Sequence, residues 1–181
     1  MAAAPPRFVQ EVGDVEASLS RGAWVALQRR ATDIPLLLVC LARERFAVLV
    51  DTAVQPPQAR RILRLRALEE VYAAQPILAV TEDGGSLWLE DVLTWAGRPV
   101  WRVEPLPVRL ALLARFTAGV VSDEALQGGL RLRARPLLSL QNAAAKMLLS
   151  AVSWEFVPIA AGQPRLRLCE KNRRDEAEHQ A

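Results

Sequence analysis

Residues 77–101, with the sequence ILAVTEDGGSLWLEDVLTWAGRPVW, contain the strongest local indication of fold in the chain. Two apolar runs with strand-like alternation flank an Asp-Gly-Gly turn at residues 83–85. Asp-Gly between such runs is the strongest short-range sign of a β-hairpin, because both residue types tolerate the positive φ angles of its turn. We therefore predict a strand, a turn and a strand over residues 77–95, followed by a second turn at residues 96–100.

Three of the five tryptophans of the chain, Trp88, Trp95 and Trp101, lie in this stretch. Strand alternation from Leu87 and Leu89 puts Trp88 on the opposite face of its strand. An indole ring on that face is available to stack on a nucleic-acid base. Packing in a core beside the hairpin is the alternative interpretation for all three rings, and the sequence leaves both open.

Asp91 is a carboxylate within an apolar strand, and it needs a partner if the strand is buried. A following apolar periodicity predicts a helix over residues 105–116, and this helix carries Arg109. Arg109 or the main chain of a turn would satisfy the carboxylate. The sequence therefore predicts a structural role for Asp91, with a ligand contact as the alternative.

The rest of the chain alternates between strand-like and helix-like segments, which indicates the α+β class. Strands are expected at residues 34–41, 45–51 and 130–138, with a second hairpin over 154–171. Residues 60–75 are ambiguous, since residues 61–68 alternate as an edge strand would while residues 67–75 favour helix. Further helices are expected at residues 14–30, 67–75 and 140–152.

The length of 181 residues suits one domain, and no apolar run approaches the roughly 20 residues of a membrane span, so we expect no membrane contact. Cys40 and Cys169 are far apart and fit no metal spacing, which favours a reducing compartment and predicts no metal or cofactor.

Lys146 and Lys171 are the only lysines, so 23 − 2 = 21 of the basic residues are arginines. Arginine suits phosphate and stacks on bases, although GC-rich coding explains the same count.

Several of these arginines fall on predicted strands. Arg45 begins the second strand of the first predicted hairpin, where it would hold a phosphate or simply face solvent. A second group alternates on two later strands and would form a basic groove for an RNA backbone or a solvated face. This second group comprises Arg131, Arg133, Arg135, Arg165, Arg167 and Lys171.

The hairpin is followed by Asp91-Val92-Leu93 and then by Trp95, Gly97 and Pro99. This run resembles the cap-binding domain of the snurportin family, a degenerate branch of the nucleotidyltransferase superfamily of mRNA capping enzymes and RNA ligases. The likeness includes an arginine at position 109 and covers residues 34–171, most specifically over residues 77–109.

The resemblance implies an α+β, nucleotidyltransferase-like fold of mixed and antiparallel sheets with flanking helices. It also implies three parts of the chain: an N-terminal leader and helix at residues 1–33, the cap-binding-like domain at residues 34–171 and a polar tail at residues 172–181.

The catalytic signature of the superfamily is absent. These enzymes carry a nucleophilic lysine in a Lys-x-Asp-Gly-x-Arg motif, and the best matching stretch here, CLARER at residues 40–45, has Cys40 at the lysine position. Only Arg45 keeps the residue of the motif. The single histidine, His179, is far from Cys40 in sequence, so we expect an inert, buried cysteine and a non-catalytic pseudoenzyme.

By this resemblance, the chain would bind the 5′ end or cap of an RNA, most simply a small nuclear RNA, and would serve as an adaptor for nuclear import between cytoplasm and nucleus. An import receptor or ribonucleoprotein proteins would be further partners. The alternatives are a structural subunit of a ribonucleoprotein that keeps only the fold, and a guanylyltransferase or RNA ligase with an unrecognised active site. The implied cap- or nucleotide-binding residues are Arg45, Trp88, Asp91, Trp95 and Arg109.

Overall fold

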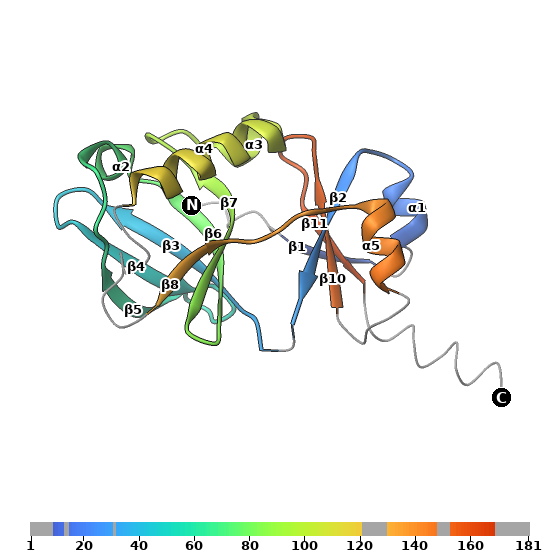
Figure 1. Ribbon diagram of the computed structural model, residues 1–181, viewed down its shortest axis with the longest axis horizontal. Coiled ribbons are helices and arrows are strands. Elements are labelled where there is room, and N and C mark those ends of the chain that lie inside the picture. Colours follow the sequence, from blue (N-terminus) through green and yellow to red (C-terminus); the bar gives the residue numbers. More distant parts are fainter. Residues whose placement is uncertain (1–8, 13–14, 31, 121–129, 148–152, 169–181) are drawn as a thin grey trace. The chain divides into compact units, whose positions relative to one another are not determined.

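The computed structural model describes residues 9–12, 15–30, 32–120, 130–147 and 153–168. These residues form two β-sheets with short helices beside them, which confirms the predicted α+β class (Figure 1). No helix in the described ranges is long and apolar enough to span a membrane.

The chain divides into two compact units, residues 32–135 and a second unit built from residues 1–31 together with 136–181. Each unit contains one of the sheets. This division differs from the predicted leader at residues 1–33 and domain at 34–171, because residues 24–29 form an interior strand of a sheet with the C-terminal hairpin.

The unit of residues 32–135 contains a six-stranded sheet. Its strands are antiparallel to their neighbours except for the last pair, which is parallel. Their order is β5 (Gln58–Arg64), β4 (Phe46–Asp51), β3 (Ile34–Leu41), β6 (Ile77–Asp83), β7 (Ser86–Thr94) and β8 (Arg131–Ala134).

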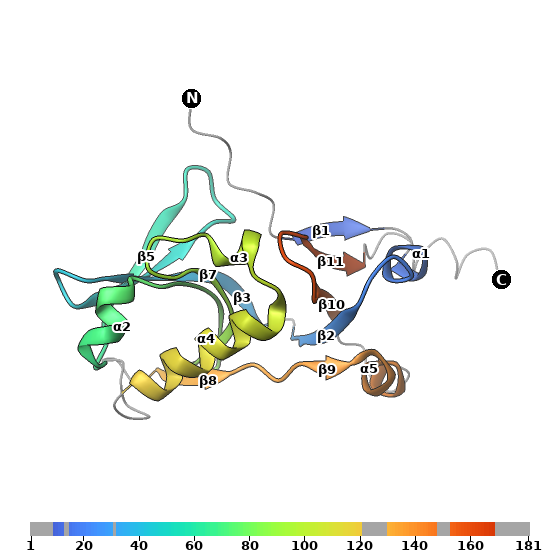
Figure 2. The same cartoon turned by 90° about the horizontal axis from the view of Figure 1, so that it is seen from above.

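One face of this sheet is covered by helices α2 (Glu69–Ala74), α3 (Val100–Val103) and α4 (Leu106–Gly119), as Figures 1 and 2 show. Alternate strand residues such as Leu38, Leu49 and Leu87 are fully buried, and Phe116 of α4 packs in the same apolar cluster. The burial of this cluster is the main stabilising contribution in the unit.

The second unit contains a five-stranded sheet in the order β1 (Val9–Val12), β11 (Arg165–Leu168), β10 (Ser153–Pro158), β2 (Trp24–Arg29) and β9 (Leu138–Ser139). Its strands are antiparallel except for β1 and β11. Its two helices are α1 (Val15–Leu19) and α5 (Leu140–Met147). The cluster of buried apolar residues in its described part comprises Ala26, Ala143, Trp154, Phe156 and Leu166.

Both predicted hairpins, the strands β3 and β4, the edge strand β5 and the helix α4 are confirmed. The predicted helix over residues 14–30 is wrong, because only Val15–Leu19 is helical and Trp24–Arg29 is a strand. Gly22 lies between the two, and β2 pairs with β10 along its whole length. This pairing supplies main-chain hydrogen bonds that override a local helical pattern.

Candidate nucleic-acid interface

Trp88 lies on β7 beside the edge strand β8, where it is the register partner of Arg133. Leu87 and Leu89 on either side of it are fully buried, while Trp88 is partly exposed. The predicted alternation is therefore confirmed. The ring lies on the face of the sheet opposite the apolar core.

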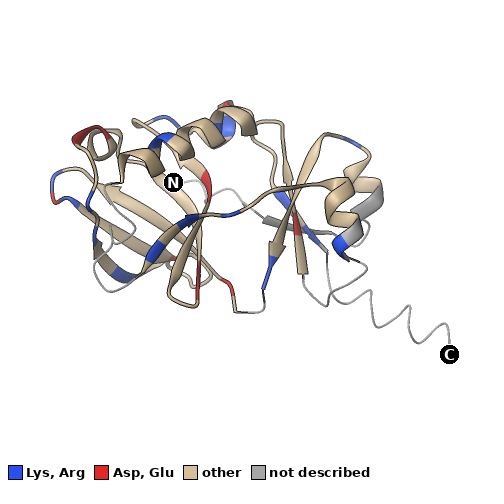
Figure 3. Ribbon diagram, viewed as in Figure 1, with Lys and Arg blue, Asp and Glu red and all other residues tan. Residues whose placement is uncertain are grey.

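Two guanidinium groups lie over the Trp88 ring. The Cζ atom of Arg135 is 5.0 Å from the ring centroid and that of Arg133 is 5.9 Å away, both within cation–π range. Arg131 and Arg133 are exposed on β8, and Figure 3 shows basic residues along this edge strand. Trp88, Arg131 and Arg133 thus form an exposed aromatic and basic strip, which we call the Trp88 strip.

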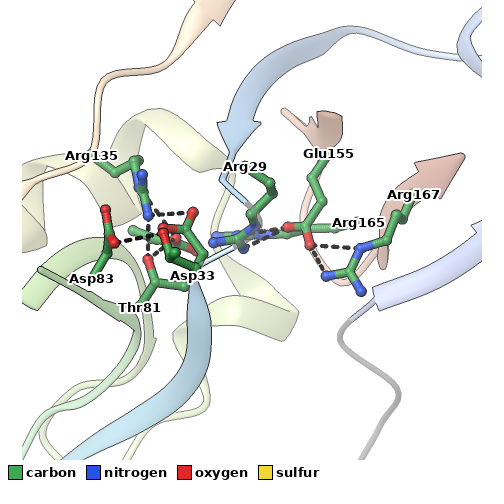
Figure 4. Close-up of polar contacts among 10 residues, drawn as sticks. Arg29, Asp33, Thr81, Asp83, Arg135, Glu155, Arg165 and Arg167 are labelled. Carbon is green, nitrogen blue, oxygen red and sulfur yellow. Dashed lines mark hydrogen bonds and ion pairs between the residues drawn. The ribbon is translucent and has the colours of Figure 1, made fainter. Parts of the chain in front are cut away.

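Arg135 differs from its neighbours on β8 because internal contacts hold its side chain, which is only 7% exposed. One nitrogen, Nη2, donates to Oδ2 of Asp33 at 2.8 Å and to Oγ1 of Thr81 at 2.6 Å (Figure 4). The Thr81 hydroxyl in turn donates to Oε1 of Glu90 at 2.7 Å. These contacts therefore hold Arg135 beside the Trp88 ring, and its predicted role as an RNA-backbone contact is not supported.

Asp91 and Arg109 form a bidentate ion pair with N–O distances of 2.9 and 3.1 Å, and both side chains are 1% exposed. Asp91 also accepts a hydrogen bond from the main-chain N–H of Val92, and Arg109 donates to the carbonyl oxygen of Glu104. The predicted structural role of Asp91 is confirmed. Because the pair is buried and holds α4 against β7, the expected ligand contacts of both residues are not supported.

Trp95 and Trp101 belong to the packing of the molecule. Trp95 is partly buried against the apolar cluster, with the Cζ atom of Arg115 5.8 Å from its ring centroid. Trp101 is buried. The core-packing interpretation therefore describes Trp101 and, in part, Trp95, whereas Trp88 lies on the face of the sheet opposite the apolar core.

Arg45 lies in the turn between β3 and β4, far from Trp88. Three strand spacings separate β4 from β7, and the registers place Phe46 opposite Leu41 but Trp88 in line with Pro35. Three spacings across the sheet and six residues along it give a separation of roughly 25 Å. Arg45 and Trp88 were predicted to bind one nucleotide together, but the sheet registers separate the two residues.

The arginines of β11 meet the carboxylate of Glu155 on β10. Arg29 Nη2 lies 2.7 Å and Arg165 Nη1 3.5 Å from Oε2 of Glu155, and Arg167 contacts Oε1 (Figure 4). Burial alone would raise the pKa of Glu155, but the three guanidinium groups outweigh burial and lower it to about 2. Arg165 is 1% exposed, so its predicted RNA contact is not supported, whereas Arg167 is partly exposed.

Cys40 is buried on β3, and burial raises the pKa of its thiol to about 12. The thiolate is therefore absent at neutral pH, which confirms the expectation of an inert cysteine.

Lys171, the remaining residue predicted to contact the RNA backbone, lies outside the described residues. Within the described ranges, no group of three or more His, Cys, Asp or Glu side chains is arranged to hold a metal ion.

The sequence did not reveal the hydrogen-bond partners of Arg135 or the role of Arg29. Asp33 and Thr81 are more than fifty residues from Arg135 in sequence, so only the strand registers bring them together. Glu155 did carry a signal, because it is a carboxylate within an apolar strand, as Asp91 is. The same argument would have predicted a buried cationic partner for it.

No protein-family model matches this chain, and no curated protein matches it.

Proposed function

We propose that this chain is a non-catalytic RNA-binding protein that holds the 5′ end or cap of an RNA at the Trp88 strip. The observation that carries the proposal is a partly exposed indole beside two exposed arginines, Arg131 and Arg133, on an edge strand. Aromatic rings that stack bases and cations that contact phosphates are the two elements of single-stranded nucleic-acid binding.

The contacts of Trp88 suggest how a base would bind. Arg135 is fixed on the ring by Asp33 and Thr81, so it keeps the indole oriented. Arg133 is exposed, and an incoming base or cap would replace its guanidinium over the ring. The displaced Arg133 and its neighbour Arg131 would then contact phosphates. One stacked base contributes about 1–3 kcal/mol to binding.

The resemblance to snurportins extends the proposal in three respects. We propose a nucleotidyltransferase-like fold, a small nuclear RNA as the ligand, and an adaptor role in nuclear import. Its support is the hairpin of β6 and β7 and the Asp91–Arg109 pair, which are the pieces on which the resemblance rests. An import receptor and movement between cytoplasm and nucleus belong to this same proposal.

A structural subunit of a ribonucleoprotein is the second candidate. Its support is that both edge strands of the six-stranded sheet, β5 and β8, carry exposed arginines. Charged residues on edge strands prevent unwanted strand pairing, so these arginines need no ligand to explain them. The two candidates make different predictions about RNA binding. The RNA-binding proposal requires the arginines of β8 and not those of β5, whereas the structural subunit requires neither.

RNA binding is tested by fluorescence anisotropy with a 3′-labelled capped oligoribonucleotide. We expect Arg131→Gln/Arg133→Gln to weaken binding at least tenfold and to lower the salt slope by about 1.4, since each single-strand phosphate contact contributes about 0.7. Arg60→Gln/Arg61→Gln removes the same charge from exposed positions on β5 and is the matched control.

Equal weakening by the β5 and β8 variants would contradict the proposal, because the interaction would then follow net charge alone. Absence of binding by the folded wild-type chain would favour the structural subunit. Competition by capped and uncapped oligonucleotides of the same sequence separates recognition of the cap from recognition of the chain.

A further inference from the structure

A second candidate binding site lies beside the β3–β4 turn, roughly 25 Å from Trp88 by the strand spacings given above. It is an open depression of about 560 Å³. Its lining includes three arginines, one acid and two aromatic rings, which are Arg45, Arg64, Arg66, Glu44, Phe46 and Tyr72.

Strand geometry explains why the arginines converge. Leu63 and Leu65 are buried in the core, so alternation turns Arg64 and Arg66 outward on the same side. Arg64 is the register partner of Phe46, which directly follows Arg45. The end of β5 and the β3–β4 turn thus bring three guanidinium groups around one depression.

The floor of the depression is held in place by Tyr72. Its hydroxyl donates to the main-chain carbonyl of Leu65 and, at 3.2 Å, to that of Arg45. This side chain therefore ties the end of β5 to the turn. The guanidinium groups lie near rings, with Arg64 Cζ 5.9 Å from the Phe46 centroid and Arg45 Cζ 6.0 Å from that of Tyr72. Such contacts restrict where the guanidinium groups point.

The lining carries more positive than negative charge, with three arginines against Glu44. Arg45 also pairs with Glu69 at 2.6 Å, but both side chains are about two-thirds exposed or more. Exposed pairs of this kind are weak, so a more highly charged anion would compete with Glu69 for Arg45. Guanidinium forks match phosphoryl oxygens in geometry and charge.

We propose that this depression binds a phosphoryl group, either the phosphate at the end of a nucleic acid or a free polyphosphate. Arg64 and Arg66 contact the phosphoryl oxygens, and Arg45 exchanges Glu69 for the ligand. The site is independent of the Trp88 strip, since the two share no residue.

The test is isothermal titration calorimetry of the full chain with inorganic triphosphate. We expect saturable binding that falls at least tenfold in Arg64→Gln/Arg66→Gln and is unchanged in Arg60→Gln/Arg61→Gln, which removes two arginines from the same strand outside the depression. Glu69→Gln should tighten binding two- to threefold, because it releases Arg45. Trp88→Leu should leave it unchanged, which separates this proposal from the RNA-binding one.

A second arm compares oligoribonucleotides of one sequence with a 5′-phosphate or a 5′-hydroxyl. A preference for the phosphate that is lost in Arg64→Gln/Arg66→Gln supports a nucleic-acid end as the ligand, and triphosphate binding alone supports a free polyphosphate. No triphosphate binding by wild type, or equal loss in the two double variants, would overturn the proposal. Circular dichroism confirms folding. The single variant Arg66→Gln replaces Arg64→Gln/Arg66→Gln if that double variant does not fold, and Arg60→Gln alone replaces the control double variant if the control does not fold.

Discussion

Burial decides which arginines of this chain are structural and which are available to a ligand. Arg109 and Arg165 are each 1% exposed and paired with buried carboxylates, whereas Arg131 and Arg133 face solvent. Strand alternation alone treats Arg133 and Arg135 as equivalent, yet only Arg135 meets Asp33. A basic strand in sequence is therefore not sufficient to predict a basic surface.

The Asp91–Arg109 pair predicts a large loss of stability when one partner is removed. Arg109→Met leaves the carboxylate of Asp91 buried without its cation, and this should cost about 3–5 kcal/mol of unfolding free energy. The exposed pair Arg98–Glu104 is the control, and Arg98→Met should cost less than about 1 kcal/mol. Urea denaturation measures both. Similar losses for the two variants would contradict the structural role of Arg109.

Glu155 predicts a specific pH dependence of stability. Its pKa is lowered from 4.5 to about 2 in the folded chain, so its contribution is fully present above about pH 4.5. The contribution is lost as the pH falls toward 2, and its size is about 3 kcal/mol. Urea denaturation from pH 6 to 3 should therefore show a steeper loss for wild type than for Glu155→Gln. Parallel curves would show that Glu155 is not held ionised by its arginines.

At the scale of secondary-structure elements, local signals predicted the hairpin of β6 and β7 and the helix α4. Strand β2 was missed because residues 24–27 are a continuous apolar run, and such a run does not distinguish a buried strand from a helix. Its pairing partner β10 lies more than 120 residues later, as the Arg29–Glu155 contact shows. Pairing over that separation leaves no trace in a short window of sequence.

The packing of α2 against α4 yields a second stability prediction. A Cβ at Gly119 would collide with Cγ2 of Val71. Gly119→Ala should therefore destabilise the chain by about 1–3 kcal/mol, although alanine favours helix more than glycine does. With Val71→Ala added, the loss should be smaller than the sum of the two single losses. Additive losses in urea denaturation would contradict the close contact.

At the scale of the whole molecule, the sequence predicted one domain where contacts define two units. The sequence contains no long Gly-, Pro- or Ser-rich linker at residues 31–32 or 135–136 that would indicate a boundary. The predicted Trp88 site was recovered in part, since alternation is a local property. The separation of Arg45 from Trp88 could not be predicted from the sequence, since it depends on the order of four strands in the sheet.

The two-unit division predicts that residues 32–135 fold alone. The large apolar cluster is formed within this segment, as is the whole six-stranded sheet. Near-ultraviolet circular dichroism of the fragment should show ordered aromatic side chains, and urea should unfold it cooperatively. A fragment without a cooperative transition would show that the unit depends on the rest of the chain.

The most direct test of RNA 5′-end binding is a tryptophan-fluorescence titration with trimethylguanosine-capped, monomethylguanosine-capped and uncapped dinucleotides. We predict saturable quenching that prefers one capped form and is weakened roughly 5- to 150-fold in Trp88→Leu, because a stacked base contributes about 1–3 kcal/mol. The control Trp95→Leu should keep the affinity of wild type. No quenching of the folded wild-type chain by any of the three, or quenching unaffected by Trp88→Leu, would contradict the account.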